Sequence, residues 1–458
     1  MCRPGAEKKF PEIRREFILD KFVIKGGRRL SGEVIISGAK NAVVAILPAV
    51  ILSDQPCIID NVPDISDVRI SLKILREMGA EVSRLDTCKY RIDPTPIKRF
   101  CVPYESAKKM RASYYFLGAL LGKYNQARVS MPGGCPLGDR PIDQHLKAFS
   151  ILGADYTLSQ GMIDLKAEKL TGNQIFFDVV TVGATMNAML AAVKAEGLTI
   201  IENAAKEPHI VDLANFLNSM GANIMGAGTD VIKIRGVNYL RGTEYSVVPD
   251  QIEAGTFMIA AAATKGDVLL KNIIPKHLES ITKKLEKIGV NIESFDDSMR
   301  VWVEADAPLV KVNVKTSPHP GFPTDMQPQI ATLLTLASGT SIVTESIWDK
   351  RFGYVDELRR MGADITVNGS VALIEGTGRL NGAPVKACDL RAGAALIIAG
   401  LAANGVTEIE DIFHIERGYD SMEIKLRQLG ADIEKVAVSD EVQTNLERNN
   451  ISENAQAV

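Results

Sequence analysis

The segment from Met131 to Pro141 brings a thiol and a cation together in one irregular stretch of chain. Its sequence, MPGGCPLGDRP, contains three glycines and three prolines, a composition that predicts a loop with glycine hinges, such as a lid. Cys135 lies five positions before Arg140. A neighbouring cation lowers the pKa of a thiol and makes it a better nucleophile or proton donor. The alternative is an inert loop cysteine, which is the commoner situation for an isolated Cys.

Polar or charged residues stand at the beginning of six nearly all-apolar stretches. If these stretches are helices, their N-termini present free backbone N–H groups and the positive end of the dipole, which favour anions. Basic side chains there would complete a receptor for phosphate or carboxylate. Taken singly, each start could also be a simple N-cap or a snorkelling basic residue. The residues concerned are Lys40, Asn41, Arg111, Thr181, Gln251, Glu253, Asp325, Asp389 and Arg391.

Common cofactor and metal motifs are absent from the sequence. There is no GxxxxGK[ST] loop, and the GAG at 226–228 lacks the third glycine and following helix of a dinucleotide fingerprint. There is no HExxH, and the five histidines stand apart from one another, which argues against a histidine zinc site. We therefore expect neither a cofactor nor a metal.

The elements that must position these residues follow an internal repeat. Six similar strings, such as ILREMGAEV and ELRRMGADI, each contain one glycine, and corresponding glycines lie 210, 209 and 209 residues apart (79 to 289, 153 to 362 and 221 to 430). This spacing predicts two halves of three units each. Each glycine follows a helix-periodic stretch, so we predict that it ends an amphipathic helix in the left-handed conformation.

Every unit also contains a stretch that is apolar on nearly all sides, for example residues 183–197 and 391–405. A helix without a polar face must be buried. The predicted fold class is therefore α/β. It comprises two similar inside-out domains of three units each, with buried helices inside, sheets and outer helices outside, and a cleft between the domains.

Composition narrows the function classes. The chain has 458 residues, of which 46% are hydrophobic and 24% charged, with a net charge of −3. This is typical of a soluble globular protein of two or three domains. The absence of a basic excess argues against nucleic-acid binding, and no apolar run reaches the ~20 residues of a membrane span. Six cysteines without a CxxC pair, and no secretory signal, indicate free thiols and a cytoplasmic location.

Nine motifs, in order along residues 21–436, resemble the UDP-N-acetylglucosamine 1-carboxyvinyltransferases, a family of enolpyruvyl transferases. The motifs are SGAKNA (37–42), KKMRAS (108–113), PGGCPLGDRPID (132–143), VGAT (182–185), ENAAKEPHIVD (202–212), PHPGFPTDMQ (318–327), RF (351–352), DLRA (389–392) and ERGY (416–419). The stretch IEAGTFMIAAAATKG (252–266) is similar to the second paralogue that Gram-positive bacteria often carry.

The resemblance implies a domain division and a reaction. Residues 40–248 would form the first domain and residues 21–39 plus 249–436 the second, with an N-terminal extension at 1–20. The polar composition of residues 437–458 predicts a disordered tail. The reaction would move the enolpyruvyl group of phosphoenolpyruvate to the 3′-hydroxyl of UDP-N-acetylglucosamine and release phosphate, opening peptidoglycan synthesis. The implied partners are these two small molecules, and the oligomeric state stays open.

The resemblance also implies roles for individual residues. Cys135 would be the loop acid, able to add covalently to phosphoenolpyruvate and to react with the epoxide fosfomycin, and Asp325 the base near the sugar hydroxyl. Phosphate would be held by Lys40, Arg140 and Arg417, the carboxylate side by Arg351 and Arg391, and Asn41 would lie between the substrates. The UDP-sugar would contact Arg111, Arg140, Pro141, Ile142, Asp143, Gln144, Asp325 and Ile347.

Three positions depart from the family pattern. Ser66 and Val179 stand where a lysine is often found, and Gln251 where an arginine is often found. These departures leave the details of nucleotide grip and interdomain contact open, but not the reaction. Three other functions stay open: the shikimate-pathway enolpyruvyl transferase, which shares fold and donor, a non-catalytic regulatory paralogue, and a repeat scaffold. The cysteine loop and the AAKEPHIVD segment favour the UDP-sugar enzyme.

Overall fold

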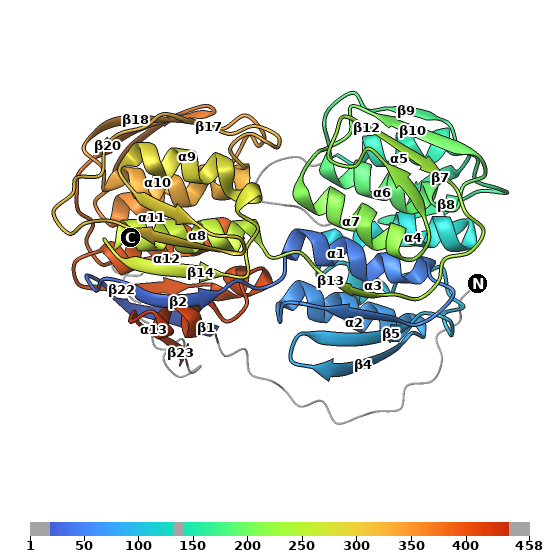
Figure 1. The fold of residues 1–458 in the computed structure, drawn as a ribbon, viewed down its shortest axis with the longest axis horizontal. Helices are drawn as coiled ribbons and strands as arrows, with labels where there is room; N and C mark the ends of the chain where they lie inside the picture. The colour runs from blue at the N-terminus through green and yellow to red at the C-terminus, as the bar shows by residue number, and fades with distance from the viewer. Residues whose placement is uncertain (1–18, 132–140, 439–458) are drawn as a thin grey trace, which may run out of the picture.

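The computed structural model describes residues 19–131 and 141–438. Figure 1 shows two bodies side by side, each with helices enclosed by strands. Each body has its own hydrophobic core. One core draws its buried residues from 39–247, and the other from 22–36 and 252–433. The predicted fold class is confirmed: the structure is mixed α/β, and its described residues form six small sheets and internal helices.

Six helices form the centre of the two bodies, three in each. Almost every residue of these helices is buried, as their uniformly apolar sequences predict. Within each body they pack against one another, as α4 does on α6 and α10 on α12. They are α1 (Lys40–Ala49), α4 (Tyr115–Tyr124), α6 (Val182–Ala192), α8 (Gln251–Ala263), α10 (Gln327–Thr335) and α12 (Leu390–Ala402).

A second set of helices lies outside the first. The six repeat glycines that follow them all have positive φ, between 92° and 113°, which confirms the predicted left-handed helix ends. These helices are α2 (Ser66–Met78), α5 (Asp143–Ile151), α7 (Pro208–Ser219), α9 (Glu279–Ile288), α11 (Val355–Arg360) and α13 (Met422–Gln428). A further short helix, α3, spans Tyr104–Ala107.

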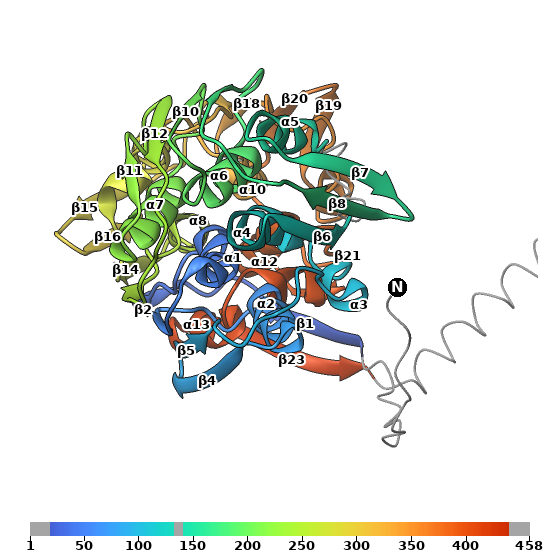
Figure 2. The same cartoon turned by 90° about the vertical axis from the view of Figure 1, so that its right-hand side faces the viewer.

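Three sheets surround the helices of each body, and Figure 2 shows strands such as β4, β7 and β15 at the periphery. The first body has the orders β13-β3-β5-β4, β6-β8-β7 and β11-β12-β10-β9. Its strands are β3 (Cys57–Asp60), β4 (Glu81–Asp86), β5 (Lys89–Asp93), β6 (Gln126–Ser130), β7 (Asp155–Ser159), β8 (Met162–Lys166), β9 (Gln174–Phe176), β10 (Leu198–Glu202), β11 (Asn223–Met225), β12 (Val231–Arg235) and β13 (Glu244–Ser246).

The second body has the orders β15-β16-β14-β2, β17-β18-β20-β19 and β21-β22-β1-β23. Its strands are β1 (Leu19–Lys25), β2 (Ser31–Ile35), β14 (Asp267–Lys271), β15 (Asn291–Ser294), β16 (Ser298–Trp302), β17 (Val314–Lys315), β18 (Gly339–Thr344), β19 (Asp364–Asn368), β20 (Val371–Gly376), β21 (Pro384–Lys386), β22 (Val406–Glu410) and β23 (Asp432–Val438).

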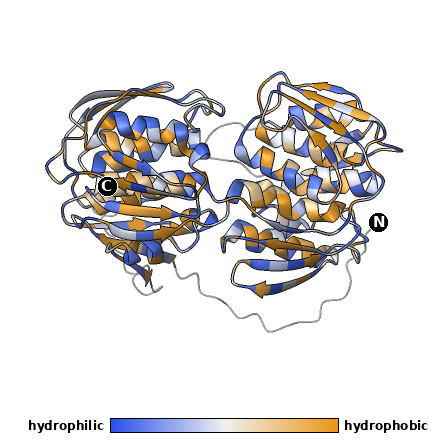
Figure 3. Cartoon of the chain, in the orientation of Figure 1, coloured by the Kyte–Doolittle hydropathy of each residue, from blue (hydrophilic) through white to orange (hydrophobic). Residues whose placement is uncertain are grey.

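One pairing pattern recurs in these sheets. Each four-stranded sheet joins one parallel pair to two antiparallel pairs, as β9-β10 and β10-β12-β11 do. In the three-stranded sheet the parallel neighbour is reduced to a single bridge, Cys101 to Arg128. Apolar and hydrophilic residues alternate along many strands in Figure 3, as expected for sheets with one buried face. The repeat in the sequence is therefore a repeat of structure.

The N-terminal strands lie in the second body, because β1 pairs with β22 and β23, and β2 pairs with β14. This pairing supports the proposed domain division. Two predicted limits were wrong by two residues: Leu19 pairs with Val438 and Asp20 with Ala437, so the sheet includes parts of the predicted extension and tail. The reason is that an antiparallel ladder is held by backbone groups, so the polar composition of a flanking segment does not mark the residue at which pairing stops. The rest of both segments lies outside the described residues.

The chain crosses between the bodies twice, and the two crossings are paired. Gly38 forms a bridge with Pro249, Ala39 N donates to Val248 O at 2.7 Å, and Asp250 N donates to Ser37 O at 2.8 Å. No helix within the described ranges is long and apolar enough to cross a bilayer.

Candidate active site

Asp325 forms the centre of a cluster of buried charges in the second body. Its Oδ1 accepts from Arg351 Nη2 at 3.1 Å, and its Oδ2 accepts from Arg391 Nε and Nη2 at 3.3 and 3.1 Å. The arginine side chains are only 2% and 3% exposed, against 27% for Asp325. Burial alone would raise the pKa of this carboxyl, but the two arginines hold it far below its usual range. Asp325 is therefore a carboxylate throughout the physiological pH range.

The sequence around Asp325 explains its position. The prediction that Asp325 begins the buried helix was wrong by two residues, because Asp325 lies in a 3-10 turn (Thr324–Met326) that directly precedes α10. The side chain caps no backbone N–H, so the simple N-cap alternative does not apply here. Two further buried donors, Arg351 Nε and Arg391 Nη1, have no hydrogen-bond partner among the residues that the structure describes. They are available to a bound anion.

Arg391 is held from two sides. The Oδ1 of Asp389 caps α12 by accepting from Arg391 N at 2.8 Å and Ala392 N at 3.0 Å, so for Asp389 the N-cap explanation is correct. The guanidinium lies over the ring of Tyr419, 5.2 Å from its centroid. The Tyr419 hydroxyl lies 2.9 Å from Thr256 Oγ1. A rigid buried network thus fixes the direction of Arg391.

A second carboxylate, Asp67, holds two cations in the same manner. Its Oδ2 lies 3.0 Å from Lys40 Nζ and its Oδ1 accepts from Arg417 Nε at 3.2 Å. Burial opposes its ionised form, yet Lys40 and Arg417 keep its pKa below the ordinary value. Lys40 begins α1, Asp67 lies in the first turn of α2, and Arg417 ends a 3-10 turn, η5 (Ile412–Arg417).

The two clusters account for five residues predicted to bind phosphoenolpyruvate. Lys40 and Arg417 share Asp67, while Arg351 and Arg391 share Asp325. Asn41, next to Lys40, reaches across to the second body, with its Nδ2 3.5 Å from Asp325 Oδ2. The contact is long, but it brings Asn41 beside the predicted base.

Apart from Asp325 and Arg140, the predicted UDP-sugar residues lie elsewhere on the two bodies. Arg111 opens a 3-10 turn (Arg111–Tyr114) one turn before α4 and acts electrostatically on His145 of α5. Pro141 and Ile142 lead into α5, which begins at Asp143. Gln144 donates to Asp178 Oδ2 at 3.0 Å and accepts from Asp178 N at 3.1 Å. Ile347 follows β18 in the second body, and its N donates to Glu345 at 2.8 Å.

Cys135 and Arg140 lie outside the described residues, so their predicted roles stay predictions. Of the departures from the family pattern, Ser66 begins α2, Val179 is 59% exposed, and Gln251 begins α8.

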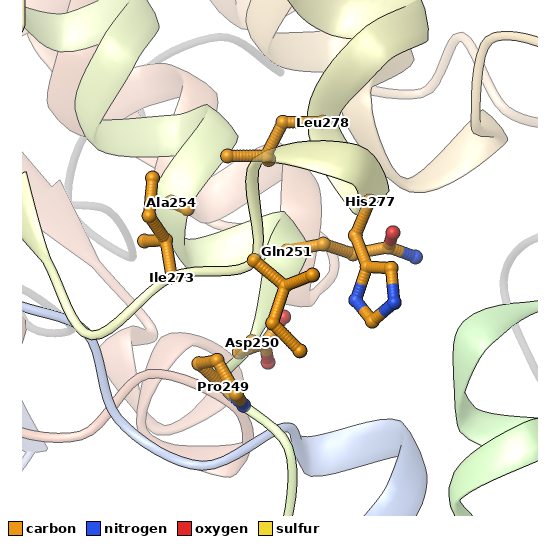
Figure 4. A pocket seen from close by; sticks show the side chains of 8 residues that line it. Pro249, Asp250, Gln251, Ala254, Ile273, His277 and Leu278 are labelled. Atoms are coloured by element: carbon orange, nitrogen blue, oxygen red, sulfur yellow. The ribbon is translucent and has the colours of Figure 1, made fainter. Parts of the chain in front are cut away.

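A small pocket lies where the chain crosses between the bodies (Figure 4), and Gln251 and His277 line it. An adjoining pocket adds Asn41 and His209 from the first body. Burial lowers the pKa of His209 and His277, and their repulsion with His319 lowers it further. Three histidines that are isolated in the sequence are therefore neighbours in the structure, although no group of three His, Cys, Asp or Glu within the described ranges could hold a metal.

Two site residues were missed by the sequence analysis. Asp67 carries no sequence signal beyond that of an acidic residue at a helix start. Asp250 was missed although an Asp before an apolar helix is a common N-cap. Its Oδ1 accepts from Ile252 N at 2.8 Å, and its Oδ2 accepts from Lys40 N at 3.2 Å. One carboxylate therefore binds the N-termini of both α8 and α1.

Comparison with known proteins identifies the family. The profile of EPSP synthase (3-phosphoshikimate 1-carboxyvinyltransferase) matches residues 24–426. A UDP-N-acetylglucosamine 1-carboxyvinyltransferase 3 from Caldanaerobacter subterraneus is 58% identical over 91% of this chain and 100% of its own length. A UDP-N-acetylglucosamine 1-carboxyvinyltransferase from Clostridium botulinum is 56% identical over 91% of this chain and 99% of its own. The chain belongs to the family of UDP-N-acetylglucosamine 1-carboxyvinyltransferases.

Solved structures agree with the family assignment. The enolpyruvyl transferase NikO from Streptomyces tendae superposes with a TM-score of 0.83 at 27% identity, over 92% of this chain and 100% of NikO. An EPSP synthase from Acinetobacter baumannii superposes with a TM-score of 0.71 at 18% identity, over 91% of this chain and 100% of its own. At this low identity, the similarity to the EPSP synthase shows a shared fold alone. Both superpositions cover the two bodies of buried helices and surrounding sheets.

Proposed function

We propose that this protein transfers the enolpyruvyl group of phosphoenolpyruvate to the 3′-hydroxyl of UDP-N-acetylglucosamine and releases phosphate. The observation that carries the proposal is the pair of carboxylate-centred clusters, which gather four cations where the two bodies meet. Phosphoenolpyruvate carries a phosphate and a carboxylate, so it needs two cationic subsites a few ångströms apart. The acceptor, UDP-N-acetylglucosamine, is inferred from the names of the two relatives.

Arg351 and Arg391 are suited to the carboxylate of phosphoenolpyruvate. Both are buried, and each retains an N–H group that has no hydrogen-bond partner in the described part of the chain. Guanidinium groups bind carboxylates through paired N–H donors. In the free protein the Asp325 carboxylate accepts hydrogen bonds from both arginines. The carboxylate of phosphoenolpyruvate would compete with Asp325 for the same N–H donors.

Asp325 is proposed to take the proton of the sugar hydroxyl. With both arginines bound its pKa is far too low for a good base. Once a substrate carboxylate engages the arginines, the pKa of Asp325 would rise and the carboxylate would become a stronger base. Asn41, within 3.5 Å of Asp325, would help to orient the hydroxyl.

The proposed transfer has two steps, an addition to phosphoenolpyruvate and the elimination of phosphate. The sugar oxygen forms a bond to C2 of phosphoenolpyruvate, while a proton is added to the C3 methylene, which becomes a methyl group. The methyl group then returns a proton to the proton donor as the C2–O bond to phosphate breaks, which restores the double bond, and the proton that Asp325 took from the hydroxyl leaves with the phosphate. Cys135 is proposed as the donor to C3, and Lys40, Arg140 and Arg417 as the groups that stabilise the departing phosphate.

The UDP-sugar is proposed to contact Arg111 and the 140–144 segment of the first body together with Ile347 of the second. Closure of the bodies would bring these surfaces together and exclude water. A cytoplasmic location follows from the proposal, because both substrates are cytoplasmic metabolites.

The decisive experiment measures phosphate release from phosphoenolpyruvate with two acceptors offered separately, UDP-N-acetylglucosamine and shikimate 3-phosphate. Release with the UDP-sugar alone is expected. Release only with shikimate 3-phosphate would make the protein an EPSP synthase in activity. Release with neither acceptor, from folded protein, would contradict the proposal and favour a non-catalytic paralogue.

A further inference from the structure

Asp67 lies behind two cations that a ligand can reach. Its side chain is 1% exposed, whereas that of Lys40 is 13% and that of Arg417 is 36% exposed. The carboxylate is therefore closed to solvent and to ligands, but its two partners are not. Because Asp67 lies in the first turn of α2, the helix backbone fixes the direction of its short side chain.

The Asp67–Arg417 pair also joins the two bodies. Asp67 belongs to the first body, and Arg417 follows buried residues of the second core. Among the ion pairs of residues 19–131 and 141–438, it alone links the two cores. A hydrogen bond between backbone and side chain also links the two bodies, in which Asp64 N donates to Asp420 Oδ2 at 2.9 Å.

Lys40 is held against the second body as well. A Cβ added to Gly418 would lie 2.9 Å from Lys40 Cδ and 2.6 Å from Leu390 Cδ2. The glycine therefore lets the chain after Arg417 pack directly on the aliphatic part of Lys40. Lys40, Asp67 and Arg417 meet at one point, although they come from three separate elements.

The hydrogen bonds to Asp67 leave donors for a ligand. Arg417 uses Nε, and its two terminal nitrogens make no hydrogen bond to a residue that the structure describes. The Lys40 ammonium has three donors, of which the contact with Asp67 needs one. Each cation can thus hold Asp67 and a tetrahedral anion at once.

We propose that Asp67 is a positioning residue for the phosphate group of phosphoenolpyruvate, which orients Lys40 from one body and Arg417 from the other so that both face the same anion. The inference rests on the proposed function. The proposed role of Asp67 differs from a purely structural one, because the loss of its carboxylate should weaken anion binding selectively and leave the UDP-sugar site unchanged.

The test compares Asp67→Asn with Asp54→Asn. Asp54 is a matched control, since its carboxylate also joins two cations of the first body, Lys123 at 2.6 Å and Lys194 at 3.4 Å, but none of the three is a predicted ligand. For Asp67→Asn we expect the KM for phosphoenolpyruvate to rise about tenfold or more. Inhibition by inorganic phosphate should weaken by a similar factor, and the KM for the UDP-sugar should change by less than about threefold.

Asp67→Glu is a second variant, which separates an effect on phosphate binding from a folding defect. It keeps the negative charge and moves the carboxylate by one methylene group. It should also raise the KM for phosphoenolpyruvate, with a melting temperature near that of the wild type. The proposal is overturned if Asp67→Asn leaves phosphate inhibition unchanged, or if it weakens both substrates equally. It is also overturned if Asp54→Asn has the same effect.

Calorimetric titration with inorganic phosphate separates this inference from the proposed function. If the wild type turns over neither acceptor but binds phosphate, and Asp67→Asn binds it about tenfold more weakly, the proposed function fails and the positioning role stands. If the wild type is active and both proteins bind phosphate equally, the positioning role fails alone.

Discussion

The Oδ2 atom of Asp325 accepts two hydrogen bonds from Arg391, from Nε at 3.3 Å and from Nη2 at 3.1 Å. The proposed base is thus paired with a proposed ligand of the substrate carboxylate. Such a pairing couples the binding of phosphoenolpyruvate to the basicity of Asp325, since any anion that draws the arginine away also removes the charge that holds the pKa down.

Replacing Arg391 with lysine should therefore change the pH dependence of the reaction. A single ammonium cannot reproduce the paired N–H donors, so the pKa of Asp325 should rise. Asp325 would then become protonated at a higher pH, and the acidic limb of kcat/KM should move upward. The measurement is a pH profile for both proteins, with Arg359→Lys as control because Arg359 pairs with the exposed Asp356 on α11. An unmoved acidic limb would show that Arg391 does not control Asp325.

Cys135→Ala should lower turnover by about a hundredfold or more, as expected when a general acid is removed, while the protein remains folded. Cys88→Ala is the matched control, because Cys88 is an exposed free thiol of the first body. A phosphoenolpyruvate-like epoxide such as fosfomycin should label Cys135, which peptide mass spectrometry would detect. Full activity in Cys135→Ala, or labelling confined to another cysteine, would remove Cys135 from the mechanism.

His145 should make the protein less stable in mild acid. Its Nδ1 lies 2.9 Å from Asn187 Nδ2, so the amide donates to a neutral ring. Burial, aided by Arg111, lowers its pKa from 6.5 to about 4. Between these values the unfolded chain binds the proton and the folded chain does not, so the free energy of unfolding falls as pH falls, by on the order of 3 kcal/mol.

The variant His145→Gln can accept the same hydrogen bond and cannot titrate. Denaturant unfolding between pH 6.5 and about 4 should show a smaller decline than in the wild type. His414→Gln should retain most of the decline, because His414 is only half-buried. Equal slopes for the wild type and His145→Gln would contradict this assignment.

Gly38→Ala should destabilise the crossing between the bodies. An added Cβ would lie 1.8 Å from the carbonyl oxygen of Asn61, so the crossing strand must shift, at a cost of about 1–3 kcal/mol or more. Gly353→Ala is the control, because its Cβ would meet only Cys388 Sγ at 3.7 Å. Thermal unfolding should give a lower Tm for Gly38→Ala, and equal values would show that the crossing tolerates a side chain.

Much of the fold could be predicted because it depends on how apolar residues and glycines are spaced over short stretches of the chain. Helices apolar on all sides, such as α12, have to be buried wherever they lie in the chain. The repeat glycines end helices because a residue without Cβ adopts the left-handed conformation at low cost, as Gly79 and Gly430 do. The outer ends of β1 and β23 could not be predicted, because their pairing joins backbone groups more than 400 positions apart in the chain.

The candidate site also has a part that could be predicted from the sequence and a part that could not. The sequence by itself determined the family, the cations and the candidate acid and base, because these depend on residue type within short motifs. Only the tertiary structure decided how the cations are held: Asp67 lies 350 positions from Arg417, and Asp250 lies 210 positions from Lys40. The physical reason is that a buried charge needs its counter-charge within a few ångströms, and which residues are that close is set by the packing of the two bodies, not by their order in the chain.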